Sequence, residues 1–274
     1  MPILDAVCQE LAKLAPLALA ESWDNVGLLV GERSQTVNRV MTCLTISPNV
    51  VDEAISEKAD LVIAHHPLPF KAIQKLTSDT IPGSMLLKLI SGGVAVYSAH
   101  TAFDSAQSGI NQMWADCFQL TNVQPLIVSP KPSSTTDSQG PVLGAGRAGR
   151  LAAQANLIDV VRQASEHVGA TSPRFVGSAD QQVTKIAFAC GSGGSFLSAA
   201  KRNGVDALIT GEATFHTCLE AESLGIGLGL LGHYWSERFA MERMAQELAE
   251  LSLGLTIWPS RSEHDPIQGL FQQN

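Results

Sequence analysis

Histidines and carboxylates follow three apolar stretches of the sequence, each at a point where a buried strand would end. These residues are His65 and His66, then His100 and Asp104, and then His233 and Glu237. In open α/β sheets, ligands bind at the carboxyl ends of the strands. Because two adjacent imidazoles are costly to bury unless something uses them, we interpret the three groups as parts of one binding site.

The residue types and their spacing indicate a site for two metal ions. Neighbouring side chains of an extended chain point to opposite sides, so one ion would seldom accept both His65 and His66, whereas two ions would. His233 and Glu237 share a face if a helix has begun by residue 233, and the Glu237 carboxylate has two oxygens with which to bridge two ions. With Asp104 as the fifth ligand, imidazole and carboxylate groups without a thiolate suit divalent Zn, Fe, Mn, Co or Ni.

The remaining histidines have other expected roles. A single histidine after a strand is more often a surface or hydrogen-bonded residue than a ligand, so the metal prediction rests on the five residues together. We expect His100 in the same pocket, where a neutral imidazole hydrogen-bonds a ligand carboxylate or a metal-bound water as donor or proton shuttle. The alternative is a His100 packed inside its own lobe. His216 is predicted to lie either next to the metal ligands or in the core, and these two alternatives stay open. His167 and His264 are predicted to be structural or exposed.

Two glycine-rich stretches are candidates for binding an anion. The stretch "CGSGGSF" follows a predicted strand and opens a helix, so backbone N–H groups of Gly191, Gly193 and Gly194 are predicted to cradle a phosphate. It lacks the P-loop lysine and the dinucleotide-binding spacing, which argues against those two classes. The stretch "GAGRAGR" is read as a turn leading into a strand, or alternatively as a place where Arg147 or Arg150 meets a phosphate.

The elements that must position these residues alternate between strands and helices. Predicted strands cover residues 37–46, 60–64, 94–99, 183–189, 205–210 and 226–232, and predicted helices cover residues 49–59, 83–93, 108–120, 156–169, 195–204 and 236–251. Ser47 and Pro48 have the residue types of an N-cap and a first-turn proline. This alternation predicts an α/β fold with largely parallel strands.

An internal echo predicts two similar lobes with the metal site between them. A shift of 146 residues lays 59–66 over 205–212, and a shift of 133 residues lays 94–104 over 227–237. The second shift superposes the histidine and the acid that follow each strand, as an ancient duplication would. We therefore predict an N-terminal lobe over residues 1–128, a linker or loop over residues 129–141, and a C-terminal lobe over residues 142–274.

The composition excludes several classes of protein. The chain has 274 residues, of which 45% are hydrophobic and 16% are charged, which is typical of a globular protein. The net charge of −8 argues against a nucleic-acid partner bound through a broad basic surface. Five scattered cysteines without a C-x-x-C pair indicate a reducing compartment. With no apolar run of membrane-spanning length, we expect a cytoplasmic protein.

Motifs along most of the chain resemble the Nif-three-like family, also labelled GTP cyclohydrolase I type 2 homologues. The matching stretches include "WDNVGLLVG", "ADLVIAHHPLPF", "VYSAHTAFD", "GAGRAGRL", "CGSGGSF", "VDALITGEATFH" and "GHYWSE". The resemblance implies a dinuclear metal centre whose ligand positions match His65, His66, Asp104, His233 and Glu237. It also implies a homohexamer, a trimer of dimers with its metal sites facing an internal cavity.

The resemblance and the ligand set favour a metal-dependent hydrolase that acts on a nucleotide-like, cyclic amide or phosphoester substrate, with Glu237 and His100 in catalysis. The sequence departs from the family at Thr45, where the family often has Asp, and around residues 122–185, which are shorter than the insertion domain of larger members. The alternative is a metal-binding scaffold or regulatory protein without catalysis. The metal, the substrate and the pathway stay open at this point.

Overall fold

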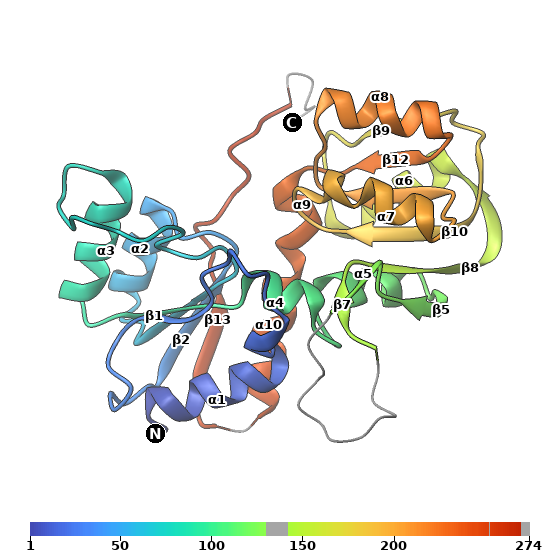
Figure 1. Ribbon diagram of the computed structural model, residues 1–274. Coiled ribbons are helices and arrows are strands. Elements are labelled where there is room, and N and C mark those ends of the chain that lie inside the picture. The colour runs from blue at the N-terminus through green and yellow to red at the C-terminus, as the bar shows by residue number, and fades with distance from the viewer. Residues whose placement is uncertain (130–141, 252, 270–274) are drawn as a thin grey trace. The chain divides into compact units, whose positions relative to one another are not determined.

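The computed structural model describes residues 1–129, 142–251 and 253–269, which form two compact units (Figure 1). Unit 1 contains residues 1–103 and 240–264, and unit 2 contains residues 104–239 and the chain from 265 onward. This division differs from the predicted one, because residues 104–128 belong to the second unit and the chain returns to the first at residue 240. The predicted linker falls almost entirely on residues 130–141, outside the described residues.

Unit 1 is a three-layer α/β unit around a five-stranded sheet of order β1-β4-β3-β2-β13. All neighbours are parallel except the edge pair of β1 and β4, which is antiparallel. Its elements are α1 (Leu4–Leu14), η1 (Leu17–Leu19), β1 (Gly27–Val30), β2 (Arg39–Cys43), α2 (Pro48–Ser56), β3 (Leu61–Ala64), α3 (Ile81–Ser91), β4 (Ala95–Ser98), α10 (Phe239–Glu250) and β13 (Thr256–Pro259). Within this unit, Figure 1 shows α2 and α3 on one face of the sheet and α1 and α10 on the other.

The local sequence explains why these elements form where they do. The Ser47 hydroxyl accepts a hydrogen bond from the Val50 N–H, and Pro48 occupies the first turn of α2, so the predicted cap is confirmed. Every residue of β3 is buried, because helices cover both faces of this parallel sheet. The strand therefore has the continuous apolar sequence from which it was predicted, and it ends where the histidines begin.

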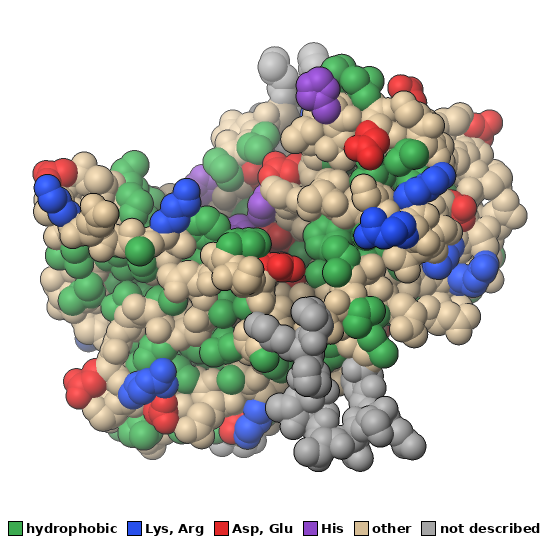
Figure 2. Space-filling model, viewed as in Figure 1, with side chains coloured by type: hydrophobic (Ala, Val, Ile, Leu, Met, Phe, Trp, Pro, Cys, Tyr) green, Lys and Arg blue, Asp and Glu red, His purple; other side chains and the backbone are tan. Residues whose placement is uncertain are grey.

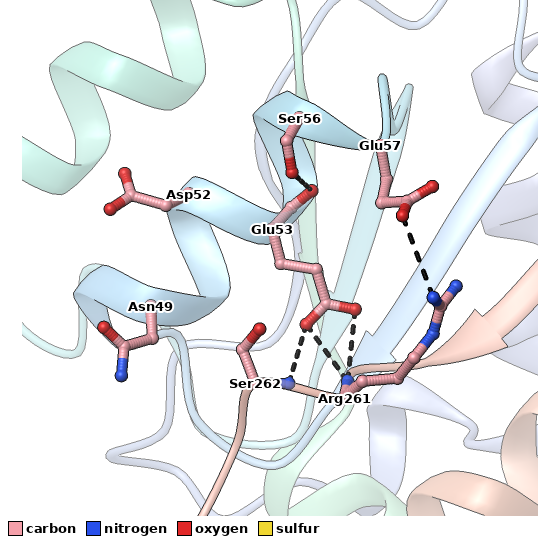
Figure 3. Close-up of a pocket in the computed structure, with 7 residues that line it drawn as sticks. All are labelled: Asn49, Asp52, Glu53, Ser56, Glu57, Arg261 and Ser262. Atoms are coloured by element: carbon pink, nitrogen blue, oxygen red, sulfur yellow. Dashed lines mark hydrogen bonds and ion pairs between the residues drawn. The ribbon is translucent and has the colours of Figure 1, made fainter.

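The return of the C-terminal segment to unit 1 depends on the buried carboxylate of Glu53. This side chain, in α2, accepts hydrogen bonds from the backbone N–H groups of Arg261 and Ser262, as Figure 3 shows. The Ser260 hydroxyl and the Trp258 indole N–H donate to the same carboxylate. Burial raises the pKa of Glu53, but these hydrogen bonds together lower it. The segment is thus held beside α2 by contacts that span more than 200 residues of sequence.

Unit 2 is also a three-layer α/β unit, with a six-stranded sheet of order β5-β8-β10-β11-β12-β9. Its central strands β10, β11 and β12 are parallel, and the outer strands are antiparallel to their neighbours. Its elements are α5 (Ile110–Cys117), β5 (Thr121–Gln124), β6 (Ile127–Val128), β7 (Gly144–Ala145), β8 (Arg147–Asn156), α6 (Leu157–Val168), β9 (Arg174–Val176), β10 (Gln182–Ala189), η2 (Gly193–Phe196), α7 (Leu197–Arg202), β11 (Ala207–Thr210), α8 (Phe215–Leu224), β12 (Gly227–Leu230) and α9 (His233–Glu237). Helix α4 (His100–Ser105) contains the last residues of unit 1 and the first of unit 2.

The two units share one topology. The order α1, β1, β2, α2, β3, α3, β4, α4 in the first half corresponds to α6, β9, β10, α7, β11, α8, β12, α9 in the second. Even single hydrogen bonds repeat: Asp60 accepts from two consecutive N–H groups at the start of β2, and Asp206 accepts from two near the start of β10, each at 2.8 Å. The predicted α/β fold with two similar lobes is confirmed.

One detail of the echo needs correction. Ala95 and Gly227 occupy equivalent positions, because each pairs with the first residue of the neighbouring parallel strand. The strands therefore correspond at a shift of 132 residues and not 133. The predicted shift does hold for α4 and α9, which begin at His100 and His233. One additional residue thus lies between strand and helix in the second half.

No helix within the described ranges is long and apolar enough to cross a membrane. On the face seen in Figure 2, several basic side chains lie near one another at the right of the view, and the others are spread among acidic, apolar and uncharged side chains.

Candidate metal centre

Unit 1 gathers three imidazoles at the carboxyl edge of its sheet. Hydrogen bonding of the backbone continues beyond the ends of the strands: His65 N–H donates to Cys43, His66 N–H donates to Leu44, and His100 N–H donates to His65, at 2.9, 2.8 and 3.2 Å. The three ring centroids consequently lie 5.1 to 5.6 Å apart. One ring nitrogen from each histidine lies within 4.8 Å of the others, which is close enough for a shared metal environment.

The orientation of His66 is set by the loop after β2. Its Nδ1 lies 2.6 Å from the Thr45 hydroxyl oxygen, and the Glu263 carboxylate in turn accepts from the N–H groups of Leu44 and Thr45 at 3.0 and 2.6 Å. The resemblance noted in the sequence implies an Asp at the position of Thr45. A neutral hydroxyl therefore contacts the ring here, and the nearby carboxylate binds the backbone of the loop instead.

Asp104 is the first residue of unit 2, and its side chain contacts the start of the glycine-rich loop. Cys190 Sγ donates to Asp104 Oδ1 at 3.2 Å, and the Asn111 side chain donates to the Asp104 carbonyl while accepting from the Cys190 N–H. Burial and the negative charges of Asp104 and Glu237 raise the pKa of the Cys190 thiol. The thiol is thus a protonated hydrogen-bond donor to the carboxylate at neutral pH.

Helix α9 presents His233 and Glu237 on one face, as their spacing predicts. His233 Nε2 lies 3.2 Å from Glu237 Oε2, and His233 Nδ1 lies 2.9 Å from Glu212 Oε1. The hydrogen bond to Glu237 raises the pKa of His233, and the contact with Glu212 raises it further. Burial lowers this pKa, but the net result is a value of about 9. The pKa of Glu212 is lowered in turn by its hydrogen bond with His233 and by a hydrogen bond from Ser192.

The glycine-rich loop packs against this pair. Gly191 has φ of +60°, and a Cβ added there would lie 2.2 Å from Glu237 Oε1 and 3.2 Å from His233 Nε2. Its N–H donates to the Ser236 hydroxyl, and the N–H of Gly193 donates to the Thr210 hydroxyl. Two of the N–H groups in the predicted anion cradle therefore have partners inside the unit. Glycine at 191 is explained by the close approach of the loop to the two side chains of α9, and phosphate binding stays a prediction.

The other predicted candidates have structural surroundings. Arg147 is buried, and its guanidinium donates to four backbone carbonyl groups and to the Gln112 side chain, so it is not placed to meet a phosphate. His167 packs edge-on against the rings of Trp114 and Phe239. His216 is exposed on α8 beside Phe215 rather than in the core, and His264 is also exposed.

Comparison of the sequence with known proteins identifies the family of the chain. A sequence profile of Duf34/NIF3 (NGG1p interacting factor 3) matches residues 3–266. The chain belongs to the Duf34/NIF3 family. The "GTP cyclohydrolase 1 type 2 homolog" of Clostridium acetobutylicum is 31% identical over 266 residues, covering 96% of this chain and 97% of the relative. The "GTP cyclohydrolase 1 type 2" of Helicobacter pylori (strain 26695) is 32% identical over 261 residues, covering 94% and 96%.

Solved structures of the Duf34/NIF3 family have the same fold. The crystal structure of a Bacillus cereus protein related to NIF3 matches with a TM-score of 0.89 at 22% identity, covering 98% of this chain and 99% of that one. At this identity the match establishes the fold, and the predicted resemblance is confirmed by the family profile and by the curated relatives.

Several residues of the Duf34/NIF3 candidate site were not predicted from the sequence. Asp24 contacts His100, Glu212 contacts His233, and Cys190 contacts Asp104. Two signals were available for them. Asp24 lies in the "WDNVGLLVG" motif, and the 146-residue shift lays Glu212 over His66. Neither signal shows which side chain the acid would meet, because the partners of these acids are 21 to 76 residues away.

Proposed function

We propose that this protein is a metal-dependent hydrolase whose five predicted ligands bind two divalent transition-metal ions. The observation that carries the proposal is that, in each unit, one histidine has its Nδ1 nitrogen held by a side-chain oxygen. His66 Nδ1 meets the Thr45 hydroxyl, and His233 Nδ1 meets the Glu212 carboxylate. Histidines that bind metal ions nearly always have their second ring nitrogen held by such an oxygen, which fixes the ring and its tautomer.

The residues of each unit fit this group. Unit 1 offers imidazoles with ring nitrogens within 4.8 Å of one another, and unit 2 offers an imidazole and a carboxylate 3.2 Å apart on one helix face. The loop backbone approaches Glu237 so closely that only glycine fits at residue 191. Imidazole and carboxylate donors are those that Zn, Fe, Mn, Co and Ni accept.

The proposed chemistry divides the work between the ions and the chain. Two such ions, when bound, lower the pKa of water towards neutrality and stabilise the negative charge that develops on a substrate. Glu237 would help to hold these ions through its carboxylate group. His65, His66, Asp104 and His233 are the remaining ligands. His100 accepts the proton of the attacking water and returns it to the leaving group, as a positioned imidazole does in general acid–base catalysis.

The substrate class rests on the relatives. The names of the two relatives refer to GTP cyclohydrolase 1 type 2, and we propose on that basis a nucleotide-like substrate with a hydrolysable cyclic amide or phosphoester bond. The homohexameric assembly stays a prediction from the family resemblance, and light scattering would test it against a mass of roughly six chains of 29.0 kDa.

The experiment is a substrate screen with protein reconstituted in each of the five metals. Nucleotides, phosphoesters and cyclic amides are offered to the wild type, to Glu237→Gln and to Glu220→Gln, in which the same change is made on an exposed carboxylate of α8. We expect metal-dependent hydrolysis by the wild type and by Glu220→Gln, and none by Glu237→Gln. Hydrolysis that survives Glu237→Gln refutes the role of that residue.

The screen also separates catalysis from metal binding alone. If metal content falls in Glu237→Gln while no compound is hydrolysed by any form, the protein is a metal-binding scaffold or regulator instead of a hydrolase. Metal content equal in all three forms would contradict the ligand set itself.

A further inference from the structure

Asp24 is a buried carboxylate that contacts the proposed proton carrier. Its side chain is 0% exposed, and its Oδ1 lies 2.7 Å from His100 Nδ1 and accepts from the Asn25 N–H at 2.8 Å. Its Oδ2 accepts from the N–H and the hydroxyl of Thr101. Both oxygens are therefore used as acceptors, which is the arrangement that suits an ionised carboxylate.

The ionised form of Asp24 is maintained at neutral pH. Burial raises the pKa of this carboxyl group, but the hydrogen bonds from His100, Thr101 and the Asn25 N–H, with the charge of a protonated His100, together outweigh burial and lower the pKa to about 2. A carboxylate without a proton can only accept a hydrogen bond, so the proton in the contact with His100 must lie on the imidazole nitrogen Nδ1.

The surroundings of His100 restrict its ring to one orientation. The residue has φ of +24°, a left-handed conformation that is unfavourable for a side chain with a Cβ and is typical of functional sites. The rings of Trp23 and Phe70 meet the imidazole nearly perpendicularly, with centroids 5.9 and 6.1 Å away. The Asn25 side chain donates to the Pro69 carbonyl at 2.7 Å, which ties the two loops that carry these aromatic rings.

The His100 ring lies beside the rings of the other two histidines. Nδ1 is engaged by Asp24, and Nε2 lies across the ring from it. The centroids of the His65 and His66 rings lie 5.2 and 5.6 Å from that of His100, and one ring nitrogen from each of the three falls within 4.8 Å of the others. In the neutral imidazole with hydrogen on Nδ1, Nε2 has a lone pair and accepts a proton.

We infer that Asp24 is a positioning residue that holds His100 as the Nδ1–H tautomer, with Nε2 directed to the histidine cluster as a proton acceptor. With hydrogen on Nδ1, the neutral His100 accepts at the cluster, which is the first step of the shuttle role that the sequence predicted. The same principle operates where a buried carboxylate orients a catalytic imidazole and stabilises its protonated form. The catalytic meaning of this inference rests on the proposed hydrolase function, but the tautomer does not.

The first test is a nitrogen-15 NMR spectrum of the histidine side chains in the metal-free full chain. The seven histidines are distinguished by their protein-specific shifts, and the His100 signals are assigned by their loss in His100→Gln. We expect the His100 signals of the wild type to have the pattern of hydrogen on Nδ1. A wild-type His100 with hydrogen on Nε2 overturns the inference, whatever any variant does.

The second test compares Asp24→Asn with Thr101→Val. An Asn side chain can donate to Nδ1, so we expect His100 in Asp24→Asn to change to the Nε2–H form or to a mixture. Thr101→Val removes one hydrogen bond to the same carboxylate and leaves the His100 contact, so its tautomer should stay as in the wild type. A pure Nδ1–H pattern in folded Asp24→Asn overturns the inference.

The third test uses a substrate from the screen and separates the two proposals. We expect kcat of Asp24→Asn to fall by about 10²-fold with little change in KM and in metal content, and kcat of Thr101→Val to stay within about threefold. An unchanged kcat in a variant whose tautomer has changed overturns the positioning role. If the tautomer behaves as expected but no form hydrolyses any compound, the proposed function fails and the structural inference stands.

Discussion

Replacing Gly191 by alanine tests whether Glu237 and His233 are metal ligands. The new methyl group would lie 2.2 Å from Glu237 Oε1, whereas an ordinary contact between such atoms is about 3.5 Å. The carboxylate must therefore withdraw by about 1 Å. Ligand distances in metal sites tolerate deviations of only about 0.2 Å, so this displacement removes Glu237 from a productive position.

The cost to the fold is expected to be much smaller than the cost to the metal. An alanine at positive φ destabilises a protein by about 1 kcal/mol, and the clashing atom is the end of a side chain, which can move. Metal affinity, in contrast, should fall at least 10–100-fold, because even the loss of an outer contact to a ligand has that effect. Gly191→Ala should thus remain folded and bind metal poorly.

Gly204→Ala is the matched control. Gly204 has φ of +62°, close to the +60° of Gly191, but a Cβ added there has nothing within 4 Å. Both variants therefore share the backbone strain, and only one introduces the clash. Metal affinity is measured by competition with a chromophoric chelator, and stability by thermal unfolding of the metal-free proteins. Equal metal affinity in the two variants would refute the assignment of Glu237 and His233 as ligands.

Three further outcomes follow from single contacts. Thr45→Val removes the hydroxyl 2.6 Å from His66 Nδ1, so metal affinity should fall about 10–100-fold in a chelator competition, and an unchanged affinity removes Thr45 from the site. The pKa of Asp24 is lowered from 3.8 to about 2 in the folded protein. Its ionisation therefore stabilises the fold by on the order of 2 kcal/mol above about pH 4, and this stabilisation is lost as the pH falls through 2. The deficit of Asp24→Asn in urea unfolding should accordingly shrink between pH 6 and pH 2, and a deficit that grows would contradict the assignment. Arg147→Met removes five hydrogen bonds to buried acceptors and should cost about 3 kcal/mol in chemical denaturation without changing metal content, whereas altered metal content would give this residue a part in the site.

The features that the sequence predicted correctly are those encoded locally. The buried strand before His65, the cap at Ser47 and the common face of His233 and Glu237 each depend on spacing within a few residues. Hydrophobic periodicity and capping chemistry act over that range, so they are visible without a structure. The repeated strand–helix order also predicted the two similar units, because each half encodes it independently.

The features that the sequence did not predict depend on contacts between distant segments. Asp24 meets His100 across 76 residues, and Glu53 meets Ser260 across 207. The second contact accompanies the parallel pairing of β13 with β2, which brings the C-terminal segment into unit 1 and overrides the boundary that composition suggested. No local pattern shows which distant side chain each of these acids meets, because the partner lies far away in the sequence.

The most direct test of the central claim is anomalous diffraction from crystals of the reconstituted protein, recorded at the absorption edge of the bound metal. The account predicts two anomalous peaks per chain, at bonding distance from His65, His66, Asp104, His233 and Glu237, with Glu237 in contact with both. A single peak, or peaks bonded to other residues, would contradict the two-metal site.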